Sequence, residues 1–210
     1  MGDSAGRRGV KGLLVDYGGV LTTNVWDSFR GFCEAEGLDP GSAKRLFRED
    51  ADARTQLRRL ERGEIDEPEF EARFGPLLGV TDNEGLVDRL FAGMKPDAAM
   101  VGAVKHAKAH GVTTGLISNS WGAGRYDREA FPEMFDAVVI SGDVGLHKPE
   151  PEIFELGCER AYLPPAECVF VDDLRENCEG AEAVGMSAVL HRGSDTTLPR
   201  LEELLGVELR

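Results

Sequence analysis

Residues 12–22 read GLLVDYGGVLT: a short apolar run ends at Asp16, and two glycines follow after one further residue. An apolar run of this length, bounded by polar residues and glycine, predicts a buried strand. An open α/β sheet keeps its chemistry at the carboxyl ends of such strands. Gly18 and Gly19 allow the backbone to turn close to whatever the Asp16 carboxylate holds. The stretch therefore predicts a parallel sheet with a polar site at the end of this strand.

Further apolar runs alternate with helical patterns along the second half of the chain. The expected strands are Gly12–Asp16, Val112–Ser118, Ala137–Ser141, Cys168–Asp172 and Ser187–His191. The expected helices between them are Asp97–His110, Glu150–Ala161 and Glu176–Val184. This alternation predicts an α/β fold with a parallel sheet and right-handed crossovers.

The segment between the first two expected strands has a different character. Residues 24–94 contain no convincing strand pattern, and Ser42–Arg62 reads as one helix. Asp66 is placed to cap a second helix, and Asn83–Ala92 is expected to form another. Lys95-Pro96 marks the return to the sheet. We therefore expect a core built from residues 1–21 and 95–210, with an all-helical insertion over residues 22–94.

Composition excludes some classes of protein. The 210 residues are 41% hydrophobic and 30% charged, with a net charge of −14. No basic face is evident, so a nucleic-acid partner is not expected. No apolar run is long enough to cross a bilayer, so no membrane partner is expected either. The four cysteines are far apart and no secretory signal precedes them, which favours reduced thiols and a cytoplasmic location. A monomer or a homodimer is compatible with the sequence.

Two further positions carry polar residues that can act on a ligand: the end of the second expected strand and the start of a later helix. Ser118 and Asn119 end the second strand, where a hydroxyl and nearby N–H groups can hold a phosphoryl oxygen. A simple Ser or Asx turn is the alternative. Lys148 stands before Pro149 at a helix start, where it can reach inward and pair with Asp16 and a phosphate. A solvated surface lysine is the alternative.

Two adjacent carboxylates end the fourth expected strand. Asp172 and Asp173 repel each other and are stable together mainly when a cation lies beside them. Asn177, in the first turn of the following helix, supplies a neutral oxygen ligand or an orienting amide. A doubly charged helix cap is the alternative interpretation.

Together these sites, from Gly12 to Ala181, resemble the four-motif pattern of the haloacid dehalogenase (HAD) superfamily. The helical insertion lies where that superfamily's C1-capped branch has its cap. The resemblance implies a Rossmann-like parallel core, a helical cap and Mg²⁺-dependent hydrolysis of a small-molecule phosphate ester.

The resemblance also implies a role for each matching residue. Asp16 corresponds to the nucleophile, Ser118 to the phosphate-holding hydroxyl and Lys148 to the charge-neutralising lysine. The metal ligands implied are Asp16, the Gly18 carbonyl and Asp173, with Asp172 as a support or second ligand and Asn177 as a supporting residue. Gly19 and Asn119 are expected to contact the substrate.

Gly18 departs from the pattern, because most phosphatases of the superfamily carry a second Asp there. Gly18 retains the carbonyl but lacks the general acid, which is worth roughly 10²–10⁴-fold when the leaving group needs a proton. Our first hypothesis is a phosphatase that uses an aspartyl-phosphate intermediate and favours good leaving groups. The alternatives are a metal-independent 2-haloacid dehalogenase and a catalytically weak protein that binds phosphorylated metabolites. His147, next to Lys148, is a weak candidate for a substitute acid.

Overall fold

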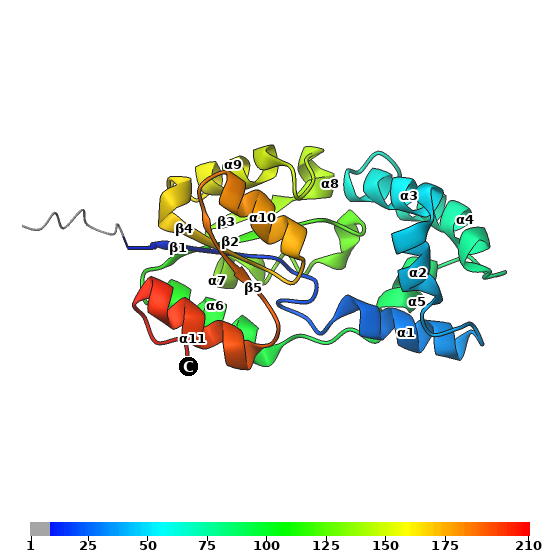
Figure 1. Cartoon of the computed structure of the whole chain (residues 1–210), viewed down its shortest axis with the longest axis horizontal. Helices are drawn as coiled ribbons and strands as arrows, with labels where there is room; N and C mark the ends of the chain where they lie inside the picture. Colours follow the sequence, from blue (N-terminus) through cyan, green and yellow to red (C-terminus); the bar gives the residue numbers. More distant parts are fainter. Residues whose placement is uncertain (1–8) are drawn as a thin grey trace, which may run out of the picture.

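The computed structural model describes residues 9–210 and contains a five-stranded sheet whose strands all pair in parallel (Figure 1). The strands are β1 (Gly12–Val15), β2 (Thr113–Ser118), β3 (Ala137–Ile140), β4 (Cys168–Asp172) and β5 (Ser187–Leu190). Their order, β3-β2-β1-β4-β5, places β1 in the middle of the sheet. The expected α/β fold with a parallel, Rossmann-like sheet is confirmed.

Helices cover both faces of this sheet. One face packs against α6 (Ala98–Ala109), α7 (Phe131–Met134) and α11 (Ser194–Leu205), and the other against α9 (Pro151–Arg160) and α10 (Arg175–Ala183). The short α8 (Ser141–Val144) follows β3 directly, and 3-10 turns occupy Ala123–Arg125 and Pro165–Glu167. The alternation of side chains along β1 explains this layering, since Leu13 and Val15 enter the first hydrophobic cluster and Leu14 enters the second.

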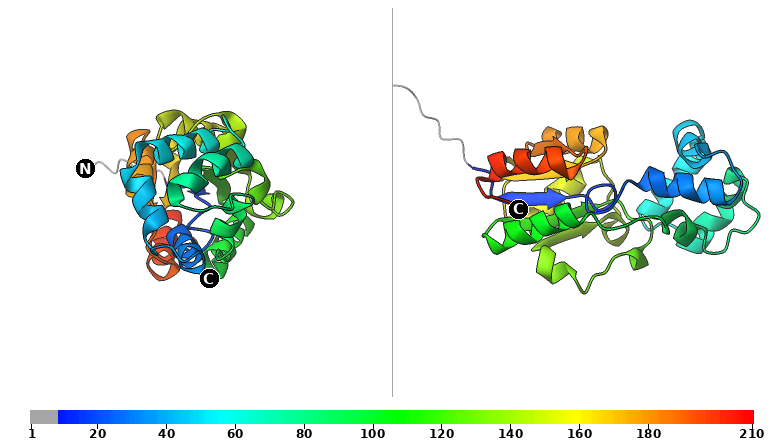
Figure 2. Two further views of the ribbon diagram at one scale, coloured as in Figure 1. Left: turned by 90° about the vertical axis from the view of Figure 1, so that its right-hand side faces the viewer. Right: turned by 90° about the horizontal axis from the view of Figure 1, so that it is seen from below.

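The segment between β1 and α6 forms a helical unit of its own. Its helices are α1 (Val25–Ala35), α2 (Ser42–Glu49), α3 (Ala51–Glu61), α4 (Glu67–Leu78) and α5 (Leu86–Phe91). They enclose a separate hydrophobic cluster that includes Phe29, Phe70 and Phe74. Figure 2 shows these helices beyond one end of the sheet, connected to it by two adjacent segments. Thr22 and Pro96 form an antiparallel bridge between those segments.

The helical boundaries in this unit differ in part from expectation. The single helix expected over Ser42–Arg62 is wrong, because the chain is extended at Asp50 and divides into α2 and α3. The Asp50 carboxylate accepts a hydrogen bond from Ala53 N at 2.8 Å and caps α3, which stabilises the break. The helix expected at Asn83–Ala92 is shorter, with Gly85 at its N-cap. The Asp66 cap is confirmed, since its carboxylate accepts from Glu69 N at 2.9 Å.

Two further points complete the fold. α11 was not expected from the sequence pattern, although it supplies Leu198 and Leu201 to the core. Among residues 9–210, no helix combines the length and apolarity needed to cross a bilayer.

Candidate active site

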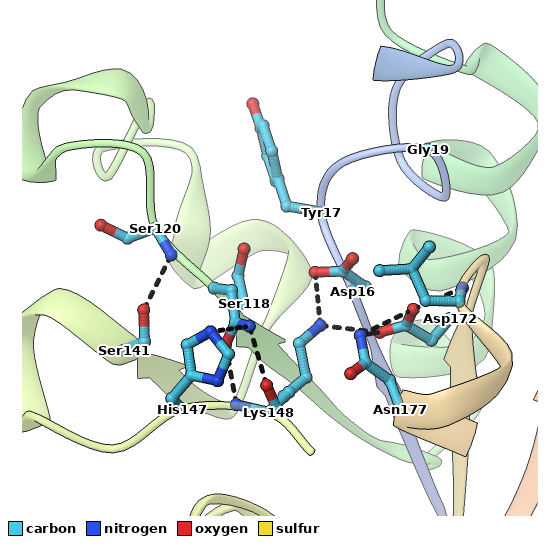
Figure 3. Close-up of polar contacts among 12 residues, drawn as sticks. Asp16, Tyr17, Gly19, Ser118, Ser120, Ser141, His147, Lys148, Asp172 and Asn177 are labelled. Atoms are coloured by element: carbon cyan, nitrogen blue, oxygen red, sulfur yellow. Dashed lines mark hydrogen bonds and ion pairs between the residues drawn. The ribbon is translucent and has the colours of Figure 1, made fainter. Parts of the chain in front are cut away.

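Three neighbouring strands bring the candidate residues to one edge of the sheet (Figure 3). Asp16 follows β1, Ser118 ends β2 and Asp172 ends β4. Val15 pairs with Leu116 on one side and with Val171 on the other, so the three strands end at nearly the same height. Residues separated by more than a hundred positions in the sequence therefore meet in one polar cluster, as expected for the carboxyl edge of a parallel sheet.

Lys148 lies at the centre of this cluster. It is only 2% exposed, and its Nζ is 2.8 Å from Asp16 Oδ1 and 2.7 Å from Asp172 Oδ2. Burial opposes the charge of the ammonium group, but the two carboxylates outweigh burial and raise the pKa of Lys148. Lys148 is therefore a permanently charged group held between two carboxylates. The pairing with Asp16 was expected from the sequence, whereas the pairing with Asp172 was not.

Asn119 positions the backbone of Lys148. Its Oδ1 accepts from Lys148 N at 2.9 Å, and its Nδ2 donates to the Lys148 carbonyl at 3.2 Å. Both ends of the amide are thus engaged by the loop that carries the lysine. Asn119 also lines the cavity described below, so its expected contact with the substrate stays a prediction.

Asp172 and Asp173 occupy different environments although they are adjacent. Asp172 is completely buried, and besides Lys148 it accepts hydrogen bonds from Leu174 N at 2.8 Å and from Asn177 Nδ2 at 3.1 and 3.0 Å. Its lone pairs are largely used within the protein. Asp173 is only partly buried and lines the cavity described below. Asp173 is therefore the better placed of the two to bind a metal ion, and Asp172 supports Lys148.

Gly19 makes room for the Asp173 carboxylate. A Cβ atom at Gly19 would lie 2.7 Å from Asp173 Oδ2, and the backbone of Gly19 has φ +74°, in the left-handed region. Only glycine satisfies both constraints. Gly19 N donates to Thr22 Oγ1 at 3.1 Å, so this N–H is already paired. Gly19 thus packs against Asp173, and its expected contact with the substrate stays a prediction.

The three acids suit a cation. Asp16, Asp172 and Asp173 each offer an oxygen, and these oxygens lie within 4.8 Å of one another. Burial, partly offset by Lys148, raises the pKa of Asp16 to about 7, and burial together with the Asp172 charge raises that of Asp173 to about 6. One lysine faces three carboxylates, so negative charge remains in excess. Oxygen ligands with excess negative charge are the donors that Mg²⁺ prefers.

A cavity of about 670 Å³ opens above these residues. Asp16, Ser118, Lys148 and Asp173 lie among its lining residues on the sheet side, and α1, α3 and α5 contribute the opposite wall. Ser118 Oγ lies 2.9 Å from the hydroxyl of Tyr126, a cavity residue that the sequence did not single out. The phosphate-holding hydroxyl expected at Ser118 thus lies at the cavity with a tyrosine as its partner.

A partly buried contact joins α3 to the loop that carries Lys148. Glu61 Oε2, at the end of α3, lies 2.6 Å from His147 Nε2, and the Glu61 carbonyl accepts from Ser141 Oγ. Glu61 lines the cavity, whereas His147 does not. His147, the weak candidate acid of the sequence, therefore contacts Glu61 but does not itself line the cavity. Glu61 was missed because nothing in its local sequence points to a partner on a distant loop.

Comparisons with known proteins agree with this geometry. A family model described as haloacid dehalogenase-like hydrolase matches residues 10–185. The chain belongs to this family. As a HAD-like hydrolase it resembles sesquiterpene phosphatase AstK of Aspergillus oryzae, with 30% identity over 70% of this chain and 78% of that protein.

The HAD-like chain also resembles part of a longer protein and a protein of known structure. Acyl-CoA dehydrogenase family member 10 of Mus musculus is 28% identical over 98% of this chain, which spans about 20% of that protein's length. A HAD family enzyme of Bacteroides thetaiotaomicron, solved with magnesium and inorganic phosphate, superposes with a TM-score of 0.61 at 23% identity, covering 86% of this chain and 93% of that one. This likeness concerns the fold.

Proposed function

We propose that this HAD-like hydrolase is a Mg²⁺-dependent phosphatase that acts on a small phosphate monoester through an aspartyl-phosphate intermediate. The observation that carries the proposal is the arrangement of Asp16, Lys148 and Asp173 on the sheet side of one cavity. A nucleophile, a fixed positive charge and an open carboxylate are the groups that phosphoryl transfer requires. The magnesium and phosphate held by the Bacteroides enzyme support the same chemistry.

Mg²⁺ fits the residues that surround the proposed phosphate site. Asp16, the Gly18 carbonyl and Asp173 would hold the ion, with Asp172 in a supporting role. When bound, Mg²⁺ would neutralise phosphate charge and offset the excess of carboxylates. We also propose that residues 22–94, which contain α1–α5, act as a cap of the C1 type, because α1, α3 and α5 line the wall opposite the nucleophile.

The residues of the chain account for each bond that changes. Lys148 binds Oδ1 of Asp16, the oxygen that would also face the ion, and Oδ2 attacks phosphorus. The bond from phosphorus to the ester oxygen breaks, and its electron pair leaves with that oxygen. Gly18 has no side chain to donate a proton, so the departing oxygen takes its proton from water. A second water then attacks phosphorus, which releases inorganic phosphate and restores the Asp16 carboxylate.

The test is phosphate release from 4-nitrophenyl phosphate with and without Mg²⁺, for the native protein and for Asp173→Asn. The proposal expects turnover that requires Mg²⁺ and is lost in Asp173→Asn. Halide release from 2-chloropropionate without metal would instead identify a dehalogenase. Mg²⁺ and phosphate binding without any turnover would identify a binding protein.

A further inference from the structure

The wall of the cavity opposite Asp16 carries six apolar side chains beside several charged ones. They come from α1, α3, α5, the connection to α6 and the loop after β2: Val25, Trp26, Leu57, Phe91, Met94 and Trp121. All six are only partly buried, so each keeps accessible surface. Trp121 packs edge-on against Phe91, with ring centroids 5.1 Å apart, which fixes its position in this wall. A ligand held at Asp16 thus faces an apolar surface.

Apart from Lys95, the charged groups on the same wall already have a charged or hydrogen-bonding partner. Arg125 lies 2.9 Å from Asp88, also pairs with Glu67, and stacks over the ring of Phe91 at 5.4 Å. Glu61 is paired with His147. In the part of the chain that the structure describes, the remaining cation of the wall is Lys95, which is exposed to solvent on the connection to α6.

This pairing determines which substituents the wall can accept. A second phosphate or a carboxylate on the leaving group would meet Glu61 and Glu67 without an unpaired buried cation to bind it, and would lose hydration there. An apolar group gains from the contact, at roughly fourfold in affinity for each methylene buried. The cavity of about 670 Å³ has the size of a small-molecule site, with room for more than a phosphate.

We propose that the substrate is the phosphate monoester of an uncharged, apolar alcohol or phenol, whose organic part binds against Trp26, Leu57 and Trp121. This inference rests on the proposed phosphatase function and specifies its substrate class. Charged sugar bisphosphates, nucleotides and phosphorylated carboxylic acids fall outside that class.

A series of 4-alkylphenyl phosphates tests the inference, because the length of the alkyl chain varies while the acidity of the leaving phenol stays nearly the same. From methyl to butyl, kcat/KM is expected to rise by roughly 60-fold, which is three methylenes at about fourfold each. 4-Ethylphenyl phosphate and 4-(hydroxymethyl)phenyl phosphate form a pair of nearly equal size. The ethyl compound is expected to be favoured about tenfold or more, because the hydroxyl group loses hydration at the apolar wall.

A matched pair of variants locates the effect. Leu57→Ser and Leu46→Ser both alter partly buried leucines that pack on the same cluster of α1–α5, but only Leu57 lines the cavity. Leu57→Ser is expected to weaken the dependence on chain length, whereas Leu46→Ser leaves it unchanged. An equal loss in both variants would overturn the assignment of the wall.

The outcomes separate this inference from the function on which it rests. Turnover that does not depend on chain length would overturn the apolar site and leave the phosphatase intact. If no ester is hydrolysed, the phosphatase proposal fails. The affinity for 4-alkylphenylphosphonates, measured by calorimetry, then still tests the apolar wall. Affinity that rises with chain length supports the apolar wall, and a constant affinity refutes it.

Discussion

The absence of an acid at Gly18 leads to a prediction that the structure makes specific. Gly18→Asp is expected to create a general acid for the leaving group. The φ of Gly18 is outside the left-handed region, so its backbone is open to any residue. A Cβ there would meet a single neighbour within 4 Å, Val25 Cγ2 at 3.2 Å, which must shift by a few tenths of an ångström. Since Gly18 lines the cavity, the new carboxyl group enters the site.

The expected size of the effect depends on the leaving group. General acid catalysis contributes about 10²–10⁴-fold, or about 3–5 kcal/mol of barrier, for an alkoxide that needs a proton. It contributes little for a 4-nitrophenolate. Gly18→Asp should therefore raise kcat/KM for 2-phenylethyl phosphate by 10²-fold or more, and change that for 4-nitrophenyl phosphate only slightly.

The assay measures phosphate release from both esters in the native protein, Gly18→Asp and Gly18→Asn. The Asn variant matches the size of Asp and supplies no acid, so it should resemble the native protein. A gain that is equal in Asp and Asn would refute the reasoning, as would native turnover that is equally fast for both esters. Gly19→Asp, at the left-handed glycine against Asp173, should instead disrupt the site.

Other predictions concern the charged cluster and its link to α3. Lys148→Met leaves two buried carboxylates without their partner, so it should abolish turnover and destabilise the metal-free protein by about 3–5 kcal/mol in urea unfolding; unchanged stability would contradict the pairing. Burial raises the pKa of Asp16 to about 7 and that of Asp173 to about 6, so the metal-free fold holds protons that the unfolded chain releases above pH 4. Stability without metal should therefore fall as pH rises from about 4 to 7, and the rise in Tm caused by Mg²⁺ should grow over the same range; a shift independent of pH would count against this site. Glu61→Gln should lower kcat more than it raises KM, because Glu61 acts on the loop of Lys148 through His147. The free energy of unfolding should stay nearly unchanged. A loss of stability that parallels the loss of activity would indicate a purely structural role.

The strands and the main polar residues could be predicted from the sequence because their signals are local. The apolar runs are bounded by charged or polar residues or by glycine, so the strand ends were placed within one residue of β1, β2 and β4. Asp16 and Asp172 end such runs, and parallel strands bring their ends together. The helix break at Asp50 was missed because the residues around it favour helix, and only the Asp50 cap at Ala53 reveals the interruption.

The rest of the site depends on contacts between distant segments. Glu61 and His147 are 86 positions apart, and neither stretch carries a motif that points to the other. The separate roles of Asp172 and Asp173 follow from burial, since one is enclosed by Lys148 and Asn177 and the other is open to the cavity. Two adjacent acids in a sequence do not reveal which of them faces the protein. The hydrogen bonds of Asn119 to the Lys148 backbone likewise link residues 29 positions apart, and no local pattern points to them.

The central claim is that Asp16 attacks phosphorus. The most direct test is to quench the protein with acid during turnover of 4-nitrophenyl phosphate with Mg²⁺ and to map phosphorylated peptides by mass spectrometry. We predict a phosphoryl group on the peptide that contains Asp16, sensitive to hydroxylamine and absent in Asp16→Asn. Turnover that persists in Asp16→Asn, or a phosphoryl group found on another residue, would contradict the account.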